Sequence, residues 1–203
     1  MTTIDQLLRH YPLISDQVNE RQVSVILTEL QKVLGSGTEG AVVEFGCYIG
    51  TTSLFIRRLL DSAGKDREFH IYDSFEGLPP KSSQDASTTG EDFIAGELAV
   101  SKKQFLREFQ KAHLQPPAVH KSWFADLGAQ DVPKKIALAF LDGDFYSSIH
   151  DSLKLVVPRM QKGGVIVVDD YGREALPGAA KAVHEFFPPE RIRVAYNLGI
   201  IQL

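Results

Sequence analysis

Several features that mark other protein classes are missing from this sequence. Cys47 is the single cysteine among 203 residues, which excludes an internal disulfide framework and a cysteine-rich zinc site. No stretch approaches the roughly 18 to 20 apolar residues that a membrane span needs, and the N-terminal segment has no apolar core of signal-peptide length. We therefore expect a cytoplasmic protein without a membrane partner.

The sequence also lacks a net positive charge. The formal net charge is −4 and the pI is about 5.9. A chain-wide basic surface of the kind that binds nucleic acid is therefore absent. We therefore expect no nucleic-acid partner, and the motifs below, rather than the composition, point to a small-molecule partner.

Short β-branched runs alternate with longer helical patterns along most of the chain. Three of the runs are almost continuously apolar, which is typical of parallel strands covered by helices on both faces. Strands are predicted at Ala41–Gly46, Glu68–Asp73, Ala118–Lys121, Ile136–Asp142 and Gly164–Asp169, and helices at Glu20–Leu34, Thr52–Asp61, Ser101–His113, Ser147–Met160 and Gly178–Phe186. The alternation indicates an α/β fold with an open, doubly wound sheet.

The last two strand-like runs, Ile192–Tyr196 and Gly199–Leu203, lie close together in the sequence. Asn197 and Leu198 alone separate them, which permits a hairpin but not a crossover. We therefore predict a seven-stranded, mostly parallel Rossmann-like sheet with a C-terminal antiparallel hairpin, the class I methyltransferase arrangement. The length suits a single domain over residues 1–203, with a helical region at residues 1–40.

Residues 74–100 resist assignment because they show no sustained period. Stretches of this length without regular structure often act as lids or binding loops. We predict a lid or acceptor-binding loop here. A surface insertion and a short helix within Glu91–Leu98 are the alternatives. The punctuating residues are Gly77, Pro79, Pro80, Gly90 and Gly96.

A glycine turn follows the first predicted strand, in the stretch EFGCYIG from Glu44 to Gly50. Glycines there let the backbone approach a ligand without a Cβ clash. The turn does not read G-x-G-x-x-G, so it is not a dinucleotide fingerprint. A carboxylate such as Glu44 can face the cationic amino group of a sulfonium methyl donor. A purely structural turn is the alternative.

Asp73 ends the second predicted strand. An acidic side chain at that place can accept hydrogen bonds from both ribose hydroxyls of an adenosyl ligand. Asp73 can also simply initiate a turn with Ser74. Together with the glycine turn, it favours S-adenosylmethionine as the ligand.

Two aspartate pairs follow consecutive strands, Asp142 and Asp144 in LDGD, and Asp169 and Asp170 in VVDD. The carboxyl ends of neighbouring strands meet at one edge of the sheet, so these carboxylates should converge. Like charges so close are costly unless they are protonated or neutralised by a cation. Oxygen ligands suit Mg²⁺, with Mn²⁺ or Ca²⁺ as substitutes. Helix capping explains one aspartate but not four.

A metal at this edge would have a chemical purpose. Coordination lowers the pKa of an acceptor hydroxyl and orients its oxygen toward the methyl carbon. A carboxylate that does not bind the metal can accept the proton. We predict Asp142, Asp169 and Asp170 as metal ligands and Asp144 as the catalytic base.

The chain resembles the macrocin O-methyltransferase family, metal-dependent enzymes that methylate sugar hydroxyls of natural products. The similarity lies in EFGCYIGTTSLFI (44–56), YDSFEGLP (72–79), KSWFADL (121–127), LDGDFYSSIHDSLKLVVPRMQKGGVIVVDDYG (141–172) and GAAKAVHEFF (178–187). The resemblance implies the same metal ligands and base. It also implies adenine contacts at residues 122–124 and a homo-oligomer. The implied donor-binding residues are Glu44, Gly46, Tyr48, Gly50, Thr51, Ser53, Asp73, Ser74, Ser122, Trp123, Phe124 and Asp142.

The sequence departs from the family at Tyr48-Ile49, where members often carry Trp-Arg. Tyrosine at that position also occurs in catechol and caffeoyl-coenzyme A O-methyltransferases, so a phenolic acceptor stays an alternative. A non-catalytic methyltransferase-like scaffold and a nicotinamide-dependent oxidoreductase are the remaining alternatives.

Overall fold

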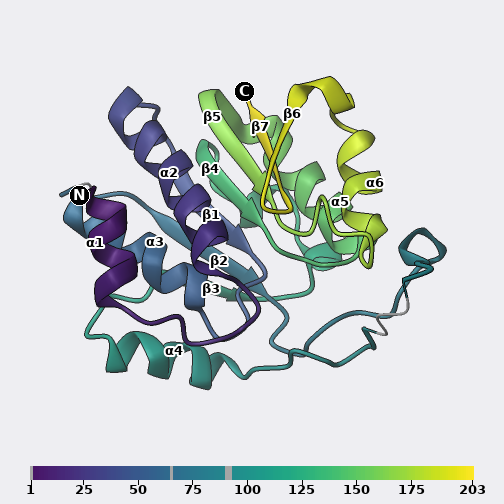
Figure 1. The fold of residues 1–203 in the computed structure, drawn as a ribbon, viewed down its shortest axis with the longest axis horizontal. Coiled ribbons are helices and arrows are strands. Elements are labelled where there is room, and N and C mark those ends of the chain that lie inside the picture. The colour runs from purple at the N-terminus through teal and green to yellow at the C-terminus, as the bar shows by residue number, and fades with distance from the viewer. Residues whose placement is uncertain (1, 65, 90–92) are drawn as a thin grey trace.

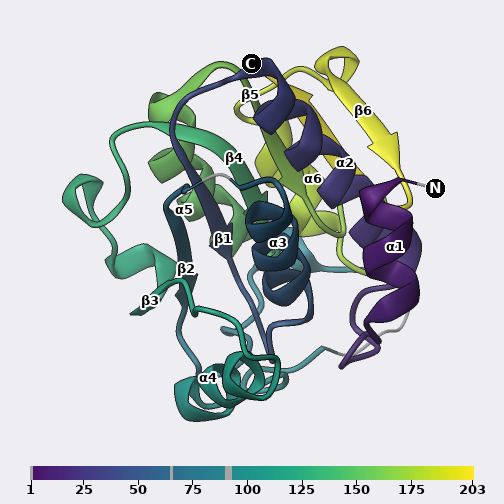
Figure 2. The same ribbon diagram turned by 90° about the vertical axis from the view of Figure 1, so that its left-hand side faces the viewer.

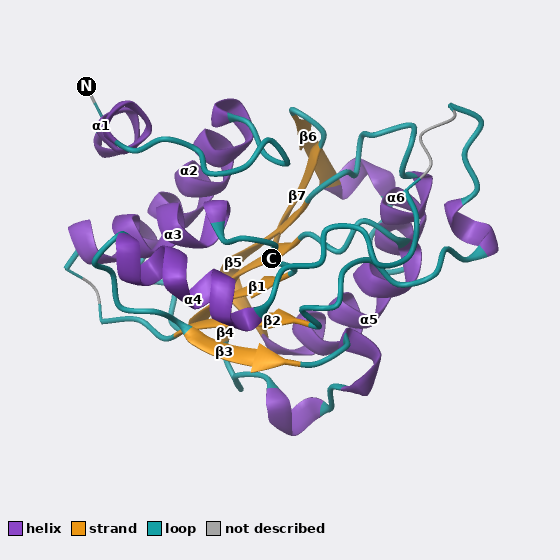
Figure 3. Ribbon diagram, turned by 90° about the horizontal axis from the view of Figure 1, so that it is seen from below, coloured by secondary structure: helices purple, strands orange, loops and turns teal. Residues whose placement is uncertain are grey.

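A seven-stranded sheet lies between two layers of helices in the computed structural model, which describes residues 2–64, 66–89 and 93–203 (Figure 1, Figure 3). The strand order is β3-β2-β1-β4-β5-β7-β6, with β3 and β6 at opposite edges (Figure 2). The parallel strands are β1 Ala41–Phe45, β2 Phe69–Asp73, β3 Ala118–Lys121, β4 Ile136–Leu141 and β5 Met160–Val168. The predicted Rossmann-like architecture is therefore confirmed.

The predicted C-terminal hairpin consists of β6 Ile192–Ala195 and β7 Leu198–Gln202. Its two turn residues are Tyr196 and Asn197, with φ of 49° and 69°. Positive φ at both positions matches the twist of two-residue hairpin turns. The link thus lies one residue earlier than predicted. The antiparallel strand β7 lies inside the sheet, between β5 and β6.

Side chains that alternate along the strands build two hydrophobic cores. On β1, Val42 packs on one face, while Ala41 and Val43 pack on the other. The first face is covered by α1 Thr3–His10, α2 Glu20–Ser36, α3 Thr51–Ser62 and α4 Lys102–Lys111, and the second by α5 Tyr146–Val156 and α6 Pro177–His184. Both layers are visible on the two sides of the sheet in Figure 3. Among the described residues, no helix is long and apolar enough to cross a membrane.

Local capping signals define the helix ends. Asn19 begins α2 with a capping box that pairs it with Gln22, and Gly37 ends the helix in a left-handed conformation. Ser101 and Gln104 form the same box at the start of α4. Each box satisfies backbone N–H groups that the first helical turn leaves without a partner.

The helix after the LDGD stretch is shorter than predicted. α5 ends at Val156 and is followed by a 3₁₀ turn, Val157–Arg159. Pro158 has no N–H for a helical hydrogen bond, although Val157 before it keeps helical dihedral angles. Met160 is therefore not the last helical residue but the first residue of β5, where it pairs with Ile136.

The segment 74–100 contains one short 3₁₀ turn, Ser83–Asp85, within its described part. Backbone hydrogen bonds between its two arms join Leu78 to Gly96 and Glu97. The alternative of a short helix at Glu91–Leu98 lies partly outside the described residues, since 91 and 92 are not described. Residues 95–98 form a turn. Further 3₁₀ turns are Phe124–Asp126, Ala129–Asp131 and Pro189–Arg191.

Candidate active site

A cleft of about 790 Å³, part of it open to solvent, lies at the carboxyl ends of β1, β2, β4 and β5. This is the edge at which open α/β sheets bind ligands. Its wall contains Gln17, Gly46, Cys47, Tyr48, Asp73, Ser74, Gly77, Leu78, Pro79, Leu98, Trp123, Phe124, Asp142, Gly143, Asp144, Ser148, Asp169, Asp170 and Arg173.

Left-handed backbone follows each of these four strands within three residues of its end. Single non-glycine residues in that region cost on the order of 1–2 kcal/mol each. Such strain persists only where surrounding structure enforces it, and it is concentrated at functional edges. The residues are Tyr48, Phe75, Asp144 and Asp170, with φ of 46°, 56°, 58° and 55°.

The glycine turn lies directly against the end of β4. Gly46 has a φ of 85°, and a Cβ at this position would overlap the backbone carbonyl oxygen of Asp142. The main-chain ladder also continues past the strand ends, because Asp142 N donates to Phe45 O at 2.8 Å. Only glycine fits here, and its fit brings the first turn against the start of the LDGD segment.

Asp73 connects the glycine turn after β1 to the turn that follows β2. Its Oδ2 accepts from Cys47 N at 2.8 Å, and its Oδ1 accepts from Phe75 N at 2.7 Å. Each carboxylate oxygen keeps further acceptor capacity. Asp73 is therefore held rigidly on the cleft wall with room for additional donors.

Glu44 is the penultimate residue of β1. It is buried, and Ser53 Oγ donates to its Oε2 at 2.6 Å. Burial raises the pKa of Glu44 to about 8, the Ser53 hydrogen bond opposes this shift, and the charge of Asp73 adds to it. Five predicted donor-binding residues are not among those that line the cleft: Glu44, Gly50, Thr51, Ser53 and Ser122.

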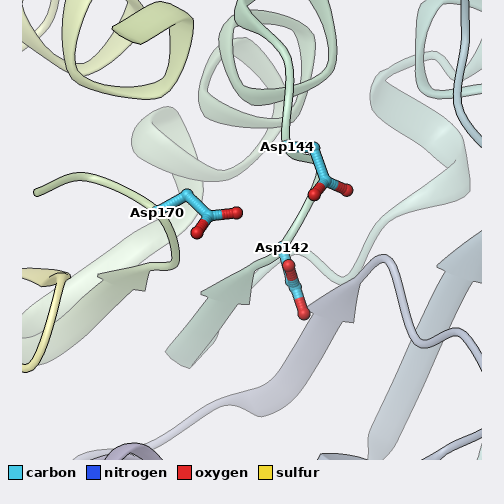
Figure 4. A group of neighbouring side chains, drawn as sticks. All are labelled: Asp142, Asp144 and Asp170. Carbon is cyan, nitrogen blue, oxygen red and sulfur yellow. The ribbon is translucent and has the colours of Figure 1, made fainter. Parts of the chain in front are cut away.

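Three carboxylates converge between the ends of β4 and β5. Oxygen atoms of Asp142, Asp144 and Asp170 lie within 4.8 Å of one another. Figure 4 shows the Asp170 carboxylate directed toward the other two. Burial raises the pKa of Asp142 and Asp144 well above the usual carboxyl value. The charge of Asp169 raises the pKa of Asp142 further, and that of Asp170 raises the pKa of Asp144.

Asp169 faces α2. Its Oδ1 accepts from Gln22 Nε2 at 3.1 Å and from Asp170 N at 2.8 Å. Gln22 Oε1 accepts from Asn19, which leaves the amide nitrogen of Gln22 directed at Asp169. Burial raises the pKa of Asp169 to about 7, with Asp170 adding to the shift. The structure thus groups Asp144 with Asp142 and Asp170, and connects Asp169 to helix α2.

The donor set at this edge consists of carboxylate oxygens. Such ligands suit a hard divalent ion, and a cation among them would neutralise their mutual repulsion. Asp142 and Asp170 are predicted ligands that the structure brings together. Arg173, whose Nη1 lies 3.5 Å from Asp170 Oδ1, adds one positive charge at the rim.

Aromatic side chains form the wall on the β3 side. Trp123 and Phe124 both contact the cleft. Phe124 packs edge-on against Phe45, which stacks on Tyr72 with ring centroids 4.5 Å apart. An aromatic wall supported by core rings suits a flat heterocycle.

Several wall residues had no signal in the sequence. Gln17 lies in an irregular segment before α2, and Arg173 follows the DDY stretch without a motif. Leu78, Pro79 and Leu98 come from the loop that the sequence predicted as a lid, but periodicity did not indicate which of its residues face the cleft.

Comparison with known proteins identifies similar sequences. The profile of the macrocin O-methyltransferase family matches residues 12–197. The chain is 32% identical over 163 residues to the 8-demethyl-8-(2,3-dimethoxy-α-L-rhamnosyl)-tetracenomycin-C 4′-O-methyltransferase of Streptomyces olivaceus, covering 77% of this chain. It is 30% identical over 171 residues to the demethyldecarbamoylnovobiocin O-methyltransferase of Streptomyces niveus, again covering 77%. The chain spans 61% and 62% of the lengths of these relatives.

A solved structure has the same fold. The O-methyltransferase NovP superposes with a TM-score of 0.77 at 26% sequence identity. The match covers 91% of this chain and 80% of that chain.

The raised carboxyl pKa values predict how stability varies with pH. In the unfolded chain these groups titrate near 4, so the folded protein binds more protons above that pH. The free energy of unfolding is then highest at low pH, and it falls as the pH rises through the carboxyl pKa values of the folded protein. In EDTA, thermal unfolding should show a Tm that falls from about pH 6 to pH 8.

Asp142→Asn should raise the Tm at pH 8 and flatten this slope, because one repelling charge is removed. The exposed Asp126 is the control, and Asp126→Asn should leave the slope unchanged. A wild-type Tm that rises over this interval would contradict the assignment.

The contact at Gly46 predicts a specific cost of adding a methyl group. Gly46→Ala should lose about 3 kcal/mol or more of the free energy of unfolding, since both backbone strain and overlap arise. Gly37→Ala is the matched control, because its φ is 74° and its added Cβ meets open space. It should lose about 1 kcal/mol. Urea denaturation measures both, and equal losses would show that the overlap at Gly46 is relieved cheaply.

Proposed function

Because the chain belongs to the macrocin O-methyltransferase family, we propose that it transfers the methyl group of S-adenosylmethionine to a hydroxyl of a small molecule. The contact between Gly46 and the Asp142 carbonyl carries this proposal. It joins the turn suited to the donor and the carboxylates suited to the acceptor in one cleft. The name of the Streptomyces olivaceus relative includes a rhamnosyl group, which supports a sugar unit of a natural product as the acceptor.

The donor subsite is proposed at the ends of β1, β2 and β3. Asp73 accepts hydrogen bonds from the ribose hydroxyls with its remaining acceptor capacity. Trp123 and Phe124 border the adenine. The methionine end lies at the glycine turn, where the N-terminus of α3 begins after Gly50 and favours negative charge such as a carboxylate.

Mg²⁺ is the proposed metal, held by ligands from Asp142, Asp169 and Asp170. When bound, it supplies Lewis acidity that lowers the pKa of the acceptor hydroxyl. Asp144 is the proposed proton acceptor. Its carboxylate oxygens lie beside those of Asp142 and Asp170, which would place it next to an acceptor hydroxyl held at this edge.

The acceptor subsite is proposed beside the segment 74–100. Leu78, Pro79 and Leu98 give this part of the wall an apolar surface, and Gln17 adds a polar group from the N-terminal segment. Apolar walls with a few polar groups are typical of small-molecule sites. We infer that this segment is the acceptor loop of one methyltransferase domain.

Titration of S-adenosylhomocysteine by calorimetry tests the donor assignment. The wild type should bind with micromolar affinity, and Asp73→Asn should weaken binding about tenfold or more, since hydrogen bonds to a charged acceptor are lost. Thermal unfolding checks that the variant is folded, because Asp73 also accepts two backbone N–H groups. The exposed Asp126→Asn serves as the charge control. No binding by the wild type, with or without Mg²⁺, would refute the methyltransferase proposal.

Metal removal tests the acceptor chemistry. Methyl transfer to a panel of sugar glycosides and phenols should stop in EDTA and return with Mg²⁺. Asp144→Asn should lower kcat by about 10²–10⁴-fold while calorimetry still detects Mg²⁺ binding. Near-normal turnover with metal bound would make the base assignment wrong. Loss of Mg²⁺ affinity in Asp144→Asn would instead make Asp144 a ligand.

A further inference from the structure

Helix α5 begins directly after the LDGD segment and depends on a distant residue for its N-terminal cap. Its own N-cap residue is Phe145, which has no side-chain oxygen with which to cap a helix. The Phe145 ring is fully buried against Leu78 and Leu176. This position therefore contributes to a small apolar cluster, and the polar cap has to come from elsewhere.

Asp85 supplies that cap from 61 residues earlier in the chain. Its Oδ1 accepts from Tyr146 N at 2.7 Å, the first helical N–H of α5. Its Oδ2 accepts from Ser82 N at 2.9 Å and Ser82 Oγ at 2.6 Å. Asp85 is buried, so its charge is stabilised by these donors and by the helix dipole.

Helix α6 packs against the contact between Asp85 and Tyr146. A Cβ on Gly178 would overlap Asp85 Oδ1 and would lie 2.7 Å from Tyr146 N. Nearby, Lys181 Nζ donates to Gln84 O at 2.5 Å, and Ser87 Oγ donates to Glu174 O at 3.0 Å. The middle of the segment 74–100 is thus attached to both helices on this face of the sheet.

The segment 74–100 contacts both residues that follow Asp144 in the chain. Leu78 packs on Phe145, and Asp85 fixes the N–H of Tyr146. Asp144 itself has a φ of 58°, a conformation that relaxes unless the neighbouring backbone is restrained. The restraint comes from the loop that also lines the acceptor side of the cleft.

We propose that Asp85 is a positioning residue for methyl transfer. It holds the turn that carries Asp144 and, through the same contact, fixes the loop beside the acceptor. The inference rests on the proposed function, since it assigns Asp85 a part in that reaction without contact with either substrate.

The test compares Asp85→Ala and Asp85→Asn with a matched control, Asp131→Ala. Asp131 also caps a 3₁₀ turn, accepting from Gly128 N at 2.7 Å, but it lies in the exposed turn Ala129–Asp131. Three properties are measured: amide hydrogen exchange of residues 144–149, the Kd of S-adenosylhomocysteine, and kcat and KM for a sugar glycoside or phenol of the panel that the wild type methylates.

In Asp85→Ala, exchange of these amides should rise about tenfold, the size expected for loss of one helix cap. The kcat should fall and the acceptor KM should rise, while the Kd of S-adenosylhomocysteine stays unchanged. Asp85→Asn should lie between Asp85→Ala and the wild type, because its amide oxygen still accepts from Tyr146 N. Asp131→Ala should match the wild type in all three measurements.

Wild-type kinetics in Asp85→Ala, with or without faster exchange, would overturn the positioning role. If the wild type methylates no acceptor, the proposed function fails, and hydrogen exchange still tests the restraint on Asp144. Equal exchange in Asp85→Ala and Asp131→Ala would then overturn this inference.

Discussion

The close approach of Gly46 to the carbonyl of Asp142 is the constraint on which the site depends. It sets the spacing between the first turn and the end of β4, so that the glycine turn and a set of carboxylates line one cleft. The hydrogen bonds that extend the ladder past the strand ends maintain this arrangement.

The site gathers features that oppose folding. Several partly or fully buried carboxyls lie near one another, and four non-glycine residues adopt left-handed backbone. Proteins tolerate such local costs when the surrounding structure compensates for them. Here the compensation comes from fully buried strands, β1 and β4, packed between two helical layers. A rigid centre therefore carries an edge that is electrostatically and conformationally unfavourable by itself.

The features that could be predicted from the sequence are those that depend on a local pattern of residues. Apolar runs marked the parallel strands, and the LDGD and VVDD stretches marked the edge where carboxylates gather. The sequence-based prediction was wrong at Met160. The helical pattern of apolar residues continues up to Met160, but in the folded chain this residue pairs with Ile136 of β4. The sequence did not indicate the Gln22–Asp169 and Asp85–Tyr146 contacts, since residues 147 and 61 positions apart meet only in the folded chain. The S-x-x-D spacing that begins at Ser82 is typical of a capping box, but it does not indicate that Asp85 also caps α5.

The position of β7 has a consequence during synthesis on the ribosome. β7 pairs with β5 on one side and β6 on the other, yet it is made after both. Until it emerges, the nascent chain exposes the hydrogen-bonding edge of β5, whose second half is apolar and fully buried in the folded protein. An open edge of this kind is a template for pairing with other chains. Chaperone demand and aggregation in the cell should therefore depend on how quickly the hairpin closes that edge.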